Sequence, residues 1–180
     1  MRSRDLSPDE AGFTEFVAAR QQPLLRAARL LTGNAADAED LVQESLARCV
    51  PVWARIADDP EPYVRTVMVR QNISRWRRRR ITEVAEPVGE SWHPHAASSS
   101  VEERDRLVAA LAQLPARQRT AVVLRHVEDR SEREAAEMMK CSLGTVKSQT
   151  HAGLARLRHL LDSATQGTVP ELSRGASQPS

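Results

Sequence analysis

The chain has 180 residues, of which 41% are hydrophobic and only 3% aromatic, and its net charge is +2. This length suits one ordinary domain or two small ones, and the scarcity of aromatic and β-branched runs excludes a sandwich or barrel and predicts an all-α fold. The N-terminus lacks the apolar core of a signal peptide and no apolar run reaches the ~20 residues of a membrane span, so we expect a cytoplasmic protein with no membrane partner.

Helical periodicity over residues 12–80 predicts a first domain. The sequence TGN at 32–34 ends its first helix, the second helix begins near Ala36, and the turn-rich ADDPEP at 57–62 precedes the third. Carboxylates in the first turns of the second helix favour the helix dipole, and this is their simplest role. The polar residues that lie outside its apolar stripe, and are therefore available to a basic partner, are Asp37, Glu39, Asp40, Gln43 and Glu44.

The third helix carries seven arginines within residues 65–80 and no carboxylate among them. Such a helix neutralises phosphates, although cations near a helix C-terminus also have a purely structural role. Tyr63 and Trp76 can stack on unpaired bases, but core packing is the simpler role for Trp76. The candidate nucleic-acid contacts of this helix are Tyr63, Arg65, Arg70, Arg75, Trp76, Arg77 and Arg78.

Residues 81–101 are rich in Pro, Gly and Ser and predict a flexible linker, so we expect two small helical domains that move relative to each other. Helical periodicity returns over 102–162, and residues 163–180 predict a disordered tail. Ser131 with Glu134 predicts a capping box, and Ser142 predicts the cap of the last helix. Two short helices joined by a tight turn predict a helix-turn-helix in the second domain.

The last helix combines an apolar stripe with a polar front and has no carboxylate in residues 141–161. The residues expected to face the core are Leu143, Val146, Leu154, Leu157 and Leu161. The small Gly144, Ala152 and Gly153 are expected to permit close approach of a duplex. The side chains that can bond to base edges and phosphates are Thr145, Lys147, Ser148, Gln149 and His151. A surface helix without a DNA role is the alternative, since helix-turn-helix geometry also occurs outside DNA binding.

No catalytic or metal-binding pattern is present in the sequence. Cys49 and Cys141 are far apart and are interpreted as buried thiols in a reducing compartment. His93 and His95 have no Cys or carboxylate at ligand spacing. No phosphate-binding loop, dinucleotide fingerprint or nucleophile elbow is found. We predict no metal, no cofactor and no enzymatic activity.

Three segments carry a resemblance to a known family: DAEDLVQE at 37–44, LPARQRTAVVLR at 114–125 and GTVKS at 144–148. Together with the arginine-rich helix between them, they resemble an extracytoplasmic-function (ECF) sigma factor of bacterial RNA polymerase, closest to the branch common in high-GC actinobacteria. The resemblance covers about residues 12–162. The last two segments are shared with other helix-turn-helix regulators. The acidic and arginine-rich helices upstream are therefore what favours a sigma factor over such a regulator.

The resemblance implies that domain 12–80 binds core polymerase and the promoter −10 element, and that domain 102–162 reads the −35 element. The acidic helix would dock on the β′ clamp, and ADDPEP occupies the position of a pocket for a flipped −10 base. The implied partners are core RNA polymerase (β′ clamp and β flap), promoter DNA and an anti-sigma factor, with the protein on the nucleoid when it is bound to polymerase. A stand-alone helix-turn-helix regulator is the main alternative, and a sigma mimic that sequesters an anti-sigma factor is another.

Four residues depart from the family pattern. Arg70 stands where an Asn is usual near the −10 strand, and Arg75 where the related branch often has Trp. Lys140 stands where the helix-turn-helix turn usually has Gly, and a non-Gly residue at positive φ costs about 1 kcal/mol. Gln149 stands where Arg is usual, and Gln pairs with adenine where Arg prefers guanine.

Overall fold

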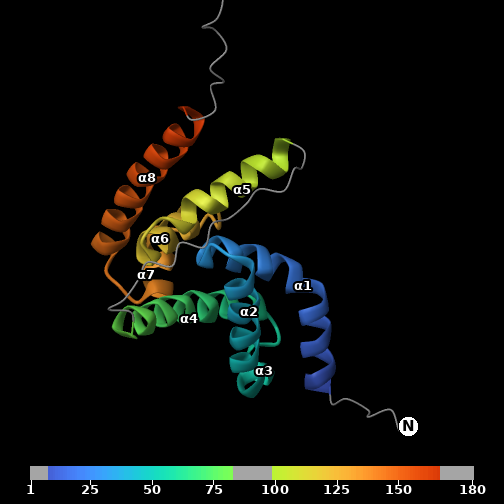
Figure 1. Ribbon diagram of the computed structural model, residues 1–180. Helices are drawn as coiled ribbons and strands as arrows, with labels where there is room; N and C mark the ends of the chain where they lie inside the picture. Colours follow the sequence, from blue (N-terminus) through green and yellow to red (C-terminus); the bar gives the residue numbers. More distant parts are fainter. Residues whose placement is uncertain (1–7, 83–98, 167–180) are drawn as a thin grey trace, which may run out of the picture.

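The computed structural model describes residues 8–82 and 99–166, and all regular elements within these ranges are helices. The first block contains α1 (Pro8–Thr32), α2 (Ala35–Cys49), the short 3-10 helix η1 (Val50–Val52), α3 (Trp53–Ile56) and α4 (Pro60–Thr82). The second contains α5 (Ser99–Ala112), α6 (Ala116–His126), α7 (Glu132–Met139) and α8 (Leu143–Gln166). The predicted all-α class with two helical regions is confirmed (Figure 1).

Parts of the predicted linker and tail are helical. Residues 81 and 82 extend α4, residues 99–101 begin α5, and residues 163–166 extend α8. The remaining linker and tail residues, 83–98 and 167–180, lie outside the described residues, so the predictions of flexibility and disorder stay predictions.

The first block is built around the long helix α1, which is visibly bent in Figure 1 and contains Pro23. Proline inside a helix removes one backbone hydrogen bond and is a common cause of such bends. Gly33, at φ 89°, ends the helix, and the Asn34 side chain accepts a hydrogen bond from the Asp37 N–H at 2.7 Å to begin α2. Leu24 and Leu41 are fully buried between these helices, and burial of each such side chain contributes about 1.5–3 kcal/mol.

The second block packs α6 along α8, and a glycine sets their separation. A Cβ on Gly153 would lie 2.7 Å from Val122 Cγ2 and 3.2 Å from the Gln118 carbonyl oxygen, both on α6. The prediction that Gly153 faces a duplex is therefore wrong, because its small size serves helix packing. Gly144 and Ala152 are exposed, and their predicted role stays a prediction.

The two blocks share one core. The buried side chains of α1 and α4, including Leu31 and Met68, belong to the same apolar cluster as Leu124 of α6 and Met138 of α7. Figure 1 shows α7 resting on α4, with α6 beside the end of α1. The sequence predicted the two helical regions but gave no indication that they pack together.

The left-handed residue at the end of α7 generates a stability prediction. Lys140 has φ 50° and ψ 56°, so the predicted positive φ at this non-Gly position is confirmed. Lys140→Gly removes the Cβ clash of the left-handed conformation, although it also increases the conformational entropy of the unfolded chain. The net effect should be an increase in the free energy of unfolding of about 0.5–1 kcal/mol. This corresponds to an increase in Tm of about 1–4 °C in thermal unfolding. Lys140→Ala is the control, because it keeps the Cβ; equal stabilisation by both variants would contradict the backbone explanation.

Candidate nucleic-acid and polymerase interfaces

Side-chain caps hold the helix-turn-helix of α7 and α8. Ser131 Oγ accepts from the Glu134 N–H at 3.2 Å, while the Glu134 carboxylate accepts from the Ser131 N–H at 2.7 Å, so the predicted capping box is confirmed. The hydrogen bonds from Ser131 hold the pKa of Glu134 below its usual value. Ser142 Oγ accepts from the Thr145 N–H at 3.1 Å, which confirms the predicted cap of α8. These contacts fix the direction in which the front of α8 projects.

Three of the five predicted DNA-reading residues are exposed on α8, and the other two lie at the edge of its buried side. Val146, Gly153 and Leu157 are buried and mark the inner side of the helix. Of the predicted readers, Lys147, Ser148 and His151 are exposed, and Thr145 and Gln149 are half-buried. The front of α8 therefore presents hydroxyl, amide, imidazole and ammonium groups outward, and these are suited to phosphates and base edges.

Leu143 does not face the core, so this prediction is wrong. The side chain is 47% exposed, because Leu143 is the first residue of α8 and α6 packs against that helix further along, at Gly153. Leu154 and Leu161 are half-buried. Leu143 instead lines an open groove at the helix-turn-helix turn, beside Lys140.

Lys147 has one ionic partner on the neighbouring helix. Its Nζ lies 3.5 Å from Oε2 of Glu132, and the Lys147 side chain is 65% exposed. Exposed pairs of this kind contribute little to stability. Lys147 can therefore exchange Glu132 for a phosphate oxygen at small cost.

Three of the predicted −10 arginines on α4 are engaged inside the protein. Arg75 Nε donates to Glu44 of α2 at 3.0 Å, and Arg70 Nη2 donates to the Glu137 carbonyl oxygen of α7 at 3.3 Å. Arg65 lies between two carboxylates, including one from the second block. The structure therefore shows α4 arginines that hold neighbouring helices, and their DNA role stays a prediction.

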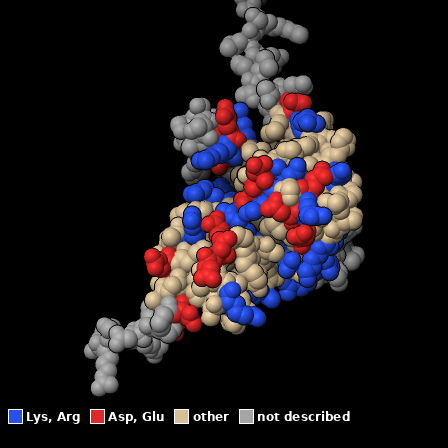
Figure 2. Space-filling model, turned by 180° about the vertical axis from the view of Figure 1, so that it is seen from behind, with Lys and Arg blue, Asp and Glu red and all other residues tan. Residues whose placement is uncertain are grey.

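The outer end of α4 is the more accessible part of the arginine run. Arg77 and Arg78 are exposed and Trp76 is half-buried; the side chains at 79 and 80 lie outside the described residues. In Figure 2, Lys and Arg gather over the region where α4 ends. This end of α4 offers positive charge to a phosphate backbone.

An open hollow lies at the other end of α4. Its volume is about 440 Å³, and it is lined by Arg55, Ile56, Asp58, Asp59, Pro62, Tyr63 and Thr66. The Tyr63 side chain, 42% exposed, forms part of its wall. The residues come from α3, the ADDPEP loop and the first turns of α4, so the hollow occupies the place where the family resemblance puts a base pocket.

Some polar residues of the acidic helix α2 are exposed to solvent, and others contact the rest of the protein. Glu39, Asp40 and Gln43 are exposed and available to a partner. Asp37 accepts a hydrogen bond from the Asn34 side chain at 2.9 Å, at the cap of the helix. Glu44 is half-buried and faces α4. The exposed trio is therefore the accessible part of the predicted polymerase-binding set.

Glu44 is the ionic link between α2 and α4. Its carboxylate accepts from Arg75 at 3.0 Å, Gln71 at 3.2 Å and Arg48 at 3.3 Å. Burial alone would raise the pKa of Glu44, but the hydrogen bonds and charges of Arg48 and Arg75 outweigh it and hold the pKa below its usual value. This carboxylate is thus ionised at neutral pH and stabilises the first block.

The cysteines, the potential metal ligands and the apolar helices of the described residues indicate no further functional site. Cys49 is buried and Cys141 half-buried, both are free thiols, and burial raises the pKa of Cys49 to about 11. Within residues 8–82 and 99–166 no group of three or more potential metal ligands is found, and no helix there is long and apolar enough to cross a bilayer.

Comparison with known protein families decides the identity of the two blocks. Residues 16–81 match the model described as sigma-70 region 2, and residues 104–157 match sigma-70, region 4. The chain belongs to the sigma-70 family. The region 2 match covers α2 and α4, and the region 4 match covers the helix-turn-helix through Leu157, so both blocks are assigned.

Individual relatives agree with this assignment. RNA polymerase sigma-E factor of Streptomyces avermitilis is 41% identical over 84% of this chain and 86% of its own length. ECF RNA polymerase sigma factor EcfG of Rhodopseudomonas palustris is 31% identical over 77% of this chain and 80% of its own. The sigma factor RpoE of Bartonella quintana, solved in complex with the anti-sigma factor NepR, aligns with TM-score 0.64 and 26% identity over 83% of this chain and 96% of that chain. The predicted resemblance to ECF sigma factors is confirmed, and the chain is an alternative sigma factor for transcription initiation.

The ionic link at Glu44 generates a pH-dependent stability prediction. Because the folded pKa of Glu44 lies below its unfolded value, its contribution is present at neutral pH and is lost as pH falls through the folded pKa. Glu44→Gln should therefore lower the free energy of unfolding by about 0.5–1.5 kcal/mol at pH 7, and this difference should shrink below about pH 4. Urea unfolding of wild type and variant from pH 3 to 7 measures this difference in the free energy of unfolding. The exposed Glu39→Gln is the control, and an identical pH profile for both variants would contradict the assignment.

Proposed function

We propose that this sigma factor binds core RNA polymerase through the exposed face of α2 and directs initiation at promoters that it contacts through α4 and α8. The observation that carries the proposal is the presence of region 2 and region 4 on one chain, in this order. A stand-alone helix-turn-helix regulator needs only the second block and has no use for an exposed acidic helix. We place this activity in the cytoplasm, on the nucleoid when the chain is bound to polymerase.

We propose that α4 meets the −10 element at its two ends. Arg77 and Arg78 supply exposed positive charge at one end, and Trp76 lies next to them. At the other end, the hollow beside Tyr63 has a volume of about 440 Å³, within the range of small-ligand pockets. Extruding a base costs a few kcal/mol, and stacking and hydrogen bonds in such a hollow can offset that cost.

An anti-sigma factor is a second proposed partner. The proposal is supported by the likeness to the Bartonella quintana sigma factor, which was solved in complex with one. That alignment spans both blocks of the present chain.

The polymerase-binding proposal gives a direct prediction. The double variant Glu39→Lys with Asp40→Lys should weaken affinity for core polymerase at least tenfold, because both side chains are exposed and lie away from the core of the chain. Multi-round transcription with purified core and a promoter template measures the loss, and circular dichroism checks that the fold is intact. Glu15→Lys, at an exposed site on α1, is the control. Transcription equal to wild type by the double variant would remove α2 as the polymerase contact, and no transcription with any form would contradict the proposed function.

The −35 proposal separates a positioning residue from a reading residue. Lys147→Ala should weaken binding on all sequences and reduce the salt dependence by about one phosphate. Gln149→Arg should instead change the preferred −35 base, with about 1–3 kcal/mol of discrimination. A promoter-library selection with each variant assembled on core polymerase measures both effects. An unaltered −35 preference in Gln149→Arg would remove Gln149 as a reader.

A further inference from the structure

The front of α8 carries a single cation and no carboxylate of its own. Within residues 143–155 the only Lys or Arg is Lys147, and residues 141–161 contain neither Asp nor Glu. A negative charge reaches this cation from the neighbouring helix α7, where Glu132 Oε2 lies 3.5 Å from Lys147 Nζ. The side chains of Lys147 and Glu132 are 65% and 40% exposed, so both are accessible to a duplex at this surface. The positive charge that Lys147 offers to DNA is therefore partly neutralised.

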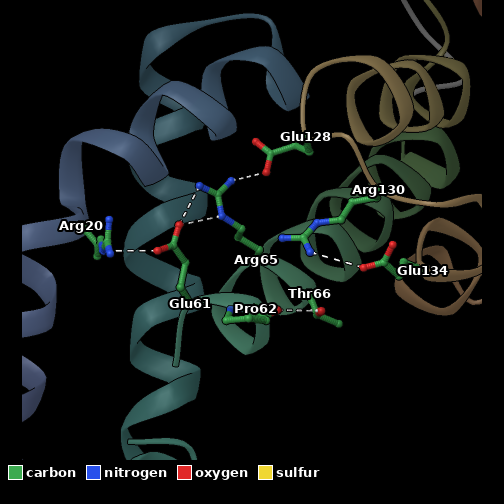
Figure 3. A network of polar contacts seen from close by, with 8 residues as sticks. All are labelled: Arg20, Glu61, Pro62, Arg65, Thr66, Glu128, Arg130 and Glu134. Carbon is green, nitrogen blue, oxygen red and sulfur yellow. Dashed lines mark hydrogen bonds and ion pairs between the residues drawn. The ribbon is translucent and has the colours of Figure 1, made fainter. Parts of the chain in front are cut away.

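The first turn of α7 holds two carboxylates, and one of them pairs with α8. Glu134 accepts from the Ser131 N–H at 2.7 Å, as part of the capping box. Figure 3 shows that Glu134 also pairs with Arg130, at 3.5 Å. Glu132 directly follows the N-cap Ser131 and pairs with Lys147. Because the capping box fixes the start of α7, it also fixes the position of Glu132 beside the front of α8.

Binding of a phosphate by Lys147 leaves the Glu132 carboxylate beside the DNA. An ammonium–phosphate hydrogen bond is about 2.8 Å long, so with Nζ in place the phosphate oxygen lies no more than about 6 Å from Glu132 Oε2. This separation is shorter than the Debye length of about 8 Å at physiological ionic strength, so the two negative charges repel each other with little screening. The phosphate contact therefore gives up an ion pair and brings like charges together.

We infer that Glu132 is a counter-charge that weakens the phosphate contact of region 4 and so limits sequence-independent binding of DNA. The inference rests on the proposed function, because it requires that Lys147 meets phosphate at the −35 element. Phosphate contacts carry no sequence information, so the counter-charge lowers affinity equally for all sequences and keeps non-promoter DNA weakly bound. Glu132 is thus a positioning residue that acts through Lys147 and reads no base itself.

A carboxylate at the start of a helix also has a purely structural role, because it favours the helix dipole. That role depends on the charge of Glu132 and on α7 alone, and it does not involve Lys147. The counter-charge role depends on the pair. Removal of Lys147 therefore separates the two roles, since it abolishes the second and leaves the first intact.

The test measures the DNA affinity of four forms of the full chain, each assembled with core polymerase: wild type, Glu132→Gln, Lys147→Ala and the double variant. One duplex carries the preferred −35 sequence and a second carries a scrambled one. Glu132→Gln should bind both duplexes about three- to tenfold more tightly, because the repulsion is removed and Lys147 is released. This gain should shrink as salt is raised and the repulsion is screened. In the Lys147→Ala background the same change should gain less than about twofold.

The matched control is Glu137→Gln, the same charge change at an exposed carboxylate of α7, which should alter affinity less than about twofold. Circular dichroism checks that all forms keep their helix content. The inference is overturned by an equal gain from Glu132→Gln with and without Lys147, by no gain, or by an equal gain in the control. A changed ratio between the two duplexes would also overturn it, because Glu132 would then read a base. Failure of wild type with core to prefer the −35 duplex would instead contradict the proposed function.

Discussion

Helix α4 must bury an apolar stripe and carry a dense run of arginines on the same 23 residues, and the rest of the structure is arranged around this constraint. Val64, Met68 and Val69 are almost completely buried, which brings their arginine neighbours close to the core. A guanidinium there cannot be left without a counter-charge, because desolvation of an unpaired cation costs several kcal/mol. The two inner arginines, Arg65 and Arg75, are therefore each matched by a carboxylate from outside α4, and these ion pairs stabilise the contacts of α4 with its neighbours.

These ion pairs join parts of the chain for which we propose different partners. Glu44, on the acidic helix, holds Arg75 and so couples the helix proposed to bind polymerase to the helix proposed to bind DNA within region 2. Glu128, in region 4, holds Arg65 and so couples the two regions. Carboxylates at these positions have a structural use, while the exposed Glu39 and Asp40 remain available to a partner. The electrostatic character of each surface thus follows from which charges the fold already uses.

Much of the fold and part of the site could be predicted from local signals. The Ser131–Glu134 capping box and the Ser142 cap depend on residues three positions apart, so spacing alone identifies them, while the positive φ of Lys140 was expected from the glycine that the family usually has there. The errors arose where local periodicity was extended to tertiary contacts. Leu143 fits the apolar period of α8 but lies at the start of the helix, away from the contact with α6, and Gly153 is small because α6 packs against it.

The sequence by itself determined the helices, their caps, the division into two blocks and the family, since periodicity, capping and motif spacing are encoded within short segments. Only the tertiary structure decided how charges are shared. Glu61 and Arg65 are four residues apart, and this spacing is a local signal for an ion pair. Glu128 is 63 positions from Arg65 and carries no such signal. The pair exists because the apolar faces of the two blocks are buried against each other, and that burial brings distant charges within bonding distance.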